Sequence, residues 1–210
     1  MADSKVELPP RDSWITVAPG EELHIDADLL QNWNEQTRKY RYLRGNILGS
    51  CFAFEYSLDL ALDEVFFPGL DVPSQNAKDS GVAIHENAKA LKGLFDEFFL
   101  KSASLSFKFK IDLLRRLAGR IGVLQALIPS DLLNNLDAVR VLRNRFAHYP
   151  VTFERRGSVP NQELHAKLIC RDETLILDQG FEDATSELFR SVTNELEEML
   201  LKLRQESCRI

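Results

Sequence analysis

Cysteine and long apolar runs are scarce in this sequence. Only three cysteines occur among its 210 residues, Cys51, Cys170 and Cys208, and no two of them form a Cys-x-x-Cys pair. An odd and widely spaced set does not build a disulfide framework, so we expect free thiols and a reducing, cytoplasmic setting. The sequence has no run of about 18 apolar residues, so we expect no transmembrane helix. Residues 1–25 contain no apolar stretch of the kind found in signal peptides.

Short motifs that bind cofactors or metals are also missing. The chain has neither of the glycine-rich loops that hold nucleotide phosphates, and it has no Gly-x-Ser-x-Gly elbow. Its four histidines show no metal-ligand spacing: His24, His85, His148 and His165. We therefore expect neither a metal nor a cofactor.

Positive charge is in deficit as well. Lysine and arginine number 26 against 32 acidic residues, which leaves a formal charge of −6. Domains that coat nucleic acid are usually basic, so the balance argues against a broad nucleic-acid-binding surface. It leaves room for a small basic site. The apolar and charged fractions, 44% and 28%, are those of an ordinary soluble globular protein.

The apolar residues follow a helical period over most of the chain. Apolar positions recur every three or four residues, with helix-capping and helix-breaking residues between the segments. Gly45 and Gly49 are expected to kink or split the first segment. We expect five principal helices, over about 28–66, 83–101, 104–121, 130–148 and 181–205.

Two segments depart from this helical pattern. The β-favouring runs His165–Cys170 and Thr174–Leu177 predict a hairpin over about 164–177. Residues 1–27 are interpreted as an extended arm, in which Trp14–Val17 forms a short strand or an anchor on the body. The predicted fold is therefore mainly all-α, a helical domain over 28–210 with one small β-hairpin before the C-terminal helix.

Charged residues interrupt two of the expected apolar helix faces. On the first helix, Glu55 and Asp59 lie four positions apart within an apolar stripe, so they stack on each other. On the fourth helix, Arg143 interrupts a stripe made of Leu132, Leu136, Val139, Phe146 and Ala147. Because an unpaired buried charge is costly, we expect Arg143 to pair with Glu55 or Asp59. The cluster is either a structural ion pair or part of an active site in which the acid orients the arginine.

Residues 143–150, Arg-Asn-Arg-Phe-Ala-His-Tyr-Pro, hold the strongest candidate site. A guanidinium binds phosphate oxygens and an imidazole exchanges protons near neutral pH, so Arg143 and His148 could together cleave an RNA backbone. Asn144 either caps backbone carbonyls or holds the phosphate. Tyr149 adds a phenol to the site or packs as a ring before proline. The alternative for His148 is a favourable interaction with the helix dipole.

These residues carry a family resemblance. An all-α chain whose late helix ends in Arg-Asn-x-x-Ala-His resembles the HEPN superfamily, whose signature is an arginine, four to six further residues, and a histidine. Asn144 matches a polar residue common after that arginine, and Glu55 or Asp59 matches an acidic residue on the first long helix. The stretch from 104 to 144 resembles the mannitol operon repressor (MltR-like) branch. The likeness covers about residues 30 to 150.

The resemblance implies a function and a form of assembly. Many HEPN proteins are metal-independent endoribonucleases, often toxins or defence effectors, that act as homodimers with both motifs at the dimer interface. It implies that Arg143, His148 and Asn144 are catalytic, that Glu55, Asp59 and Tyr149 support them, and that the substrate is single-stranded RNA. A cognate antitoxin or regulatory protein is the expected partner. The alternative is a non-enzymatic regulator or protein-interaction module on the same fold.

Overall fold

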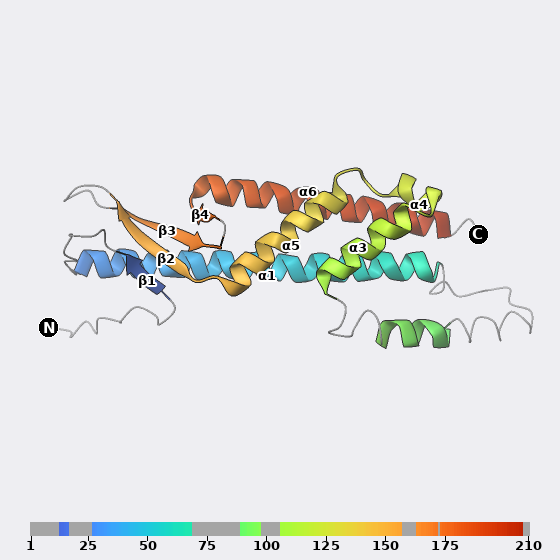
Figure 1. Cartoon of the computed structure of the whole chain (residues 1–210), viewed down its shortest axis with the longest axis horizontal. Coiled ribbons are helices and arrows are strands. Elements are labelled where there is room, and N and C mark those ends of the chain that lie inside the picture. Colours follow the sequence, from blue (N-terminus) through green and yellow to red (C-terminus); the bar gives the residue numbers. More distant parts are fainter. Residues whose placement is uncertain are drawn as a thin grey trace, which may run out of the picture. The chain divides into compact units, whose positions relative to one another are not determined.

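The structure is a computed structural model, and it describes residues 13–16, 27–68, 89–97, 106–156, 163–171 and 173–207. Helices dominate these residues, as the sequence predicts (Figure 1). No helix in the described part of the chain is long and apolar enough to cross a membrane. The helical elements are α1 (Ala27–Phe66), a segment at 89–97, α3 (Phe107–Ala118), α4 (Gly122–Leu127), α5 (Leu132–His148) and α6 (Gln179–Ser207).

The helix ends follow local chemistry. The hydroxyl of Ser106 accepts a hydrogen bond from the backbone N–H of Phe109 at 3.3 Å, which caps the start of α3. Gly119 follows the end of α3, so the expected third helix stops there and α4 forms separately. Helix α5 ends at His148, two positions before Pro150, because proline disfavours helical backbone in the residue before it.

The structure corrects one expectation for the first helix, α1, and confirms part of the second expected helix. It runs unbroken for 40 residues, so Gly45 and Gly49 do not split it. A Cβ at either glycine would meet nothing within 4 Å, so neither position is held as glycine by close packing. The expected second helix is confirmed at 89–97, and the rest of its predicted span lies outside the described residues.

The predicted hairpin is part of a larger sheet of four strands, in the order β1-β2-β3-β4 (Figure 1). Strands β3 (Glu163–Ile169) and β4 (Thr174–Ile176) pair antiparallel, which confirms the predicted hairpin. Strand β2 (Val151–Arg156) pairs antiparallel with β3 and was not predicted. Of the two interpretations of Trp14–Val17, a strand or an anchor, the structure shows the strand: β1 (Ser13–Thr16) runs parallel to β2.

The chain contacts divide it into two compact units. The first unit comprises 1–50 and 141–187, and it contains the sheet. Its buried side chains come from the early part of α1, from the end of α5 and from alternate positions of β2 and β3. The ring of Phe146 stacks on Tyr40 and on Phe181, with centroids 6.1 and 5.8 Å apart. The core residues of this unit are Trp33, Tyr40, Ile47, Leu142, Phe146, Val151, Phe153, Leu164, Ala166 and Leu168.

The second unit comprises 51–140 and 188–210. Its apolar core combines the later part of α1 with α3, α4, the early part of α5 and most of α6. Polar contacts join these helices: the Asn135 amide donates to Glu195 at 3.2 Å, and Arg115 pairs with Asp137 at 2.8 Å. The largest fully buried side chains of this unit are Leu58, Leu62, Phe107, Ile111, Leu114, Leu132, Leu136 and Met199. The expected division of the chain into an arm before 28 and one domain after it stays a prediction.

Candidate functional site

The end of α5 presents the motif residues at different depths. Asn144 and His148 are exposed, whereas Arg143 and Tyr149 are half-buried. The cause is helical spacing: Leu142 and Phe146, four positions apart, face the core of the first unit, so Asn144 and His148 project on other sides. His148 is therefore available to solvent and is not enclosed in the protein interior.

His148 lines an open pocket of about 260 Å³ in the first unit. Side chains from α1 join it there, because the Arg44 guanidinium donates to the Ala147 carbonyl at 3.4 Å. This bond satisfies one of the carbonyls that a helix leaves unpaired at its C-terminal end, and it brings a positive charge to the histidine's pocket. The lining residues are Tyr40, Arg44, Ala147, His148, Tyr149, Pro150 and Val151.

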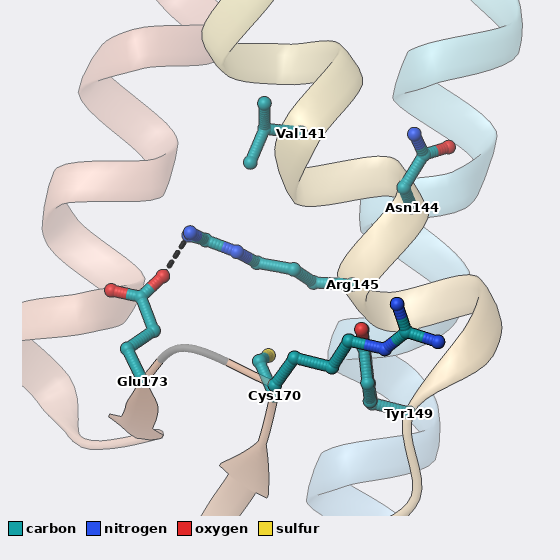
Figure 2. A pocket seen from close by; sticks show the side chains of 7 residues that line it. Val141, Asn144, Arg145, Tyr149, Cys170 and Glu173 are labelled. Carbon is teal, nitrogen blue, oxygen red and sulfur yellow. Dashed lines mark ion pairs between the residues drawn. The ribbon is translucent and has the colours of Figure 1, made fainter.

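Asn144 lines a different pocket of about 210 Å³, between the end of α5 and the turn from β3 to β4. Figure 2 shows Arg145 extending from α5 to the carboxylate of Glu173, with which it forms an ion pair. Cys170, the residue after β3, contributes a thiol side chain that is partly exposed. The lining residues are Val141, Asn144, Arg145, Tyr149, Cys170, Arg171 and Glu173.

The structure thus brings some predicted residues together and distributes the others. Tyr149 lines both pockets, His148 only the first and Asn144 only the second. Arg143 lines neither of the two. The cation that lines the pocket of His148 is Arg44, which sequence reasoning missed. No local pattern marks Arg44, because it lies 103 positions from Ala147 and only folding brings the two together.

Glu55 and Asp59, the two expected supporting acids, belong to the second unit and meet a different cation. The ammonium of Lys110, on α3, lies 3.2 Å from a Glu55 oxygen and 2.7 Å from an Asp59 oxygen. Lys110 is only 3% exposed. It takes the role that the sequence analysis assigned to Arg143. The expectation that a cation pairs with these carboxylates is confirmed, but the cation is Lys110 and not Arg143.

Burial of Asp59 and the charge of Lys110 shift the pKa of Asp59 in opposite directions. Partial burial raises the pKa of Asp59, and the hydrogen bond and charge of Lys110 oppose the rise without cancelling it. The nearby carboxylate of Glu55 adds to the rise, because like charges disfavour ionisation. The one lysine therefore does not fully offset the effect of burial on Asp59. We interpret the Glu55–Asp59–Lys110 cluster as structural.

Among the described residues, no group of three or more histidine, cysteine, aspartate or glutamate side chains is placed to hold a metal ion.

The chain matches no protein-family model, no curated protein and no solved structure. What the two pockets do must therefore be inferred from their own chemistry.

Proposed function

We propose that the protein is a metal-independent endoribonuclease of HEPN type that cleaves single-stranded RNA. The observation that carries the proposal is the pocket at the end of α5, which an exposed imidazole and a guanidinium line together. An imidazole can carry a proton near neutral pH, and a guanidinium can bind phosphate oxygens in two parallel hydrogen bonds. These are the two functions that cleavage of an RNA phosphodiester requires of the protein.

The chemistry assigned to the pocket is an attack from within the RNA. His148 takes the proton from a ribose 2′-hydroxyl, and the freed oxygen attacks the neighbouring phosphorus. The bond from that phosphorus to the 5′ oxygen of the next nucleotide breaks, and the leaving oxygen takes a proton from the imidazolium or from water. Arg44 offsets the negative charge that grows on the phosphate oxygens. Tyr149 also lines this pocket, and its phenol can donate a hydrogen bond to that phosphate.

Arg143 of the sequence motif and Arg44 of the pocket are alternative candidates for binding the scissile phosphate. On an ideal helix, side chains five positions apart point about 140° away from each other, so Arg143 and His148 diverge if α5 stays regular to its end. The HEPN resemblance assigns phosphate binding to Arg143, whereas the pocket assigns it to Arg44. Substituting each arginine by alanine separates the two: the arginine that holds the scissile phosphate should lower kcat by about 10²-fold or more.

The test is incubation of the purified protein with single-stranded RNA in the presence of EDTA. We expect cleavage by the wild type and loss of about 10²–10⁴ in rate in His148→Gln, the usual cost of removing a general base or acid. The matched control is His165→Gln, which removes a half-buried imidazole of β3 that lines neither pocket. If wild type and His148→Gln leave the RNA equally intact at several pH values, the non-enzymatic regulator is the better assignment.

The resemblance also predicts a homodimer and, for a toxin, a cognate antitoxin. Large aromatic side chains exposed on α1 support a protein–protein interface that includes this helix. Tyr42, Phe52 and Tyr56 are 73%, 63% and 64% exposed. Light scattering should then give twice the 24.0 kDa of one chain. A mass of one chain across the micromolar range would contradict the dimer.

A further inference from the structure

The second pocket has more hydrogen-bond donors than acceptors among its side chains. Arg145 and Arg171 contribute two guanidiniums, Asn144 an amide and Tyr149 a phenol, while Glu173 is the one carboxylate among the lining residues that the structure describes. The described lining residues carry two positive charges and one negative charge, so together they are net positive, in a chain whose formal charge is −6. A pocket of this composition suits an anion with several oxygen acceptors.

The two arginines are not equivalent. Arg145 already forms an ion pair with Glu173, which reduces the charge that it can offer to a ligand (Figure 2). Arg171 is exposed at the turn after β3 and lines the pocket together with residues of α5. An exposed guanidinium can close on an oxyanion in two parallel hydrogen bonds without first breaking a pair. Arg171 should therefore contribute most of the binding, and Glu173 should oppose it.

Tyr149 connects this pocket to the histidine pocket, because it is a lining residue of both. Single-stranded RNA carries one phosphate per nucleotide, and its bases stack on aromatic side chains. We propose that the pocket of Asn144, Arg145 and Arg171 binds a backbone phosphate of the RNA that flanks the phosphate beside His148. The RNA then crosses Tyr149 between the two pockets. This inference rests on the proposed function, since it assigns the second pocket to the same substrate.

The test is equilibrium binding of a fluorescein-labelled oligouridine, measured by anisotropy over a range of salt concentrations. His148→Gln serves as the parent protein, so that the probe stays intact. Adding Arg171→Ala should weaken binding about fivefold and lower the salt slope by about 0.7, the value for one phosphate contact on a single strand. Adding Glu173→Gln should strengthen binding, because it removes a negative charge and frees Arg145. The control is Arg204→Ala, which removes an exposed arginine of α6 in the second unit.

Binding and cleavage separate this inference from the proposed function. If the wild type cleaves RNA but neither Arg171→Ala nor Glu173→Gln changes affinity relative to Arg204→Ala, the phosphate pocket is refuted and the nuclease stands. If nothing is cleaved but the two variants shift affinity in opposite directions, the nuclease is refuted and the pocket stands. Equal losses of affinity in Arg171→Ala and Arg204→Ala mean an effect of net charge alone, which also overturns the pocket.

Discussion

Replacing Lys110 by methionine should destabilise the second unit strongly. The lysine ammonium lies 2.7 Å from Asp59 and 3.2 Å from Glu55, and no more than 3% of the residue is exposed. Methionine keeps the apolar stem and removes the charge, so two carboxylates are left facing each other without a cation. Removing one partner of a buried ion pair costs about 3–5 kcal/mol. Because both acids remain about one-fifth exposed, we expect the lower end of that range, about 3 kcal/mol.

The sign of the pH dependence follows from the pKa of Asp59, which is already raised in the folded protein. Loss of Lys110 raises it further, since the opposing hydrogen bond and charge disappear. A carboxyl whose folded pKa lies above its unfolded value contributes stability at low pH that is lost as the pH rises through the folded value. The deficit of Lys110→Met should therefore shrink as the pH is lowered from 7 towards the ordinary aspartate pKa of 3.8.

Urea unfolding followed by far-ultraviolet circular dichroism measures both effects. The decisive control is the triple variant Lys110→Met, Glu55→Gln, Asp59→Asn, which removes all three charges and should recover most of the lost stability. The reasoning is refuted if Lys110→Met stays within about 0.5 kcal/mol of the wild type, the usual range of an inconsequential surface substitution. It is also refuted if the triple variant is less stable than the single one.

Three further substitutions test other parts of the structure. Asp137→Asn should cost about 1 kcal/mol at pH 7; burial acts to raise the pKa of Asp137, but hydrogen bonds from two arginines outweigh it and lower the pKa, so the loss should fade as the pH drops below 3.8 in urea titrations. Ser106→Ala removes the N-cap of α3 and should cost about 1 kcal/mol by chemical denaturation, with Ser106→Asp restoring it. Phe146→Ala empties a fully buried position of the first unit and should cost about 3–5 kcal/mol, visible as a lower melting temperature.

Residues close together in the sequence determined the elements that were predicted correctly. The long helix α1, the end of α5 before Pro150 and the hairpin around Arg171 depend on helical period, proline and turn residues. Each of these signals acts within a few positions of the chain, so they are readable without knowledge of the fold. Sequence reasoning missed β2, although it follows α5 closely. Its hydrogen bonds come from β3 and from β1, which is more than 130 positions away.

For the candidate site too, local sequence predicted some features and tertiary packing decided the others. The sequence by itself predicted His148 and Asn144 as site residues, which stays a prediction, and it predicted a cation beside Glu55 and Asp59, because a charge on an apolar stripe needs a partner. Only the tertiary structure decided which cation answers and which residues share a pocket. Lys110 and Arg44 come from other helices and reach their partners across 51 and 103 positions. The physical reason is that a local sequence pattern shows that a buried charge needs a partner. The packing of elements that are distant in the sequence decides which residue becomes that partner.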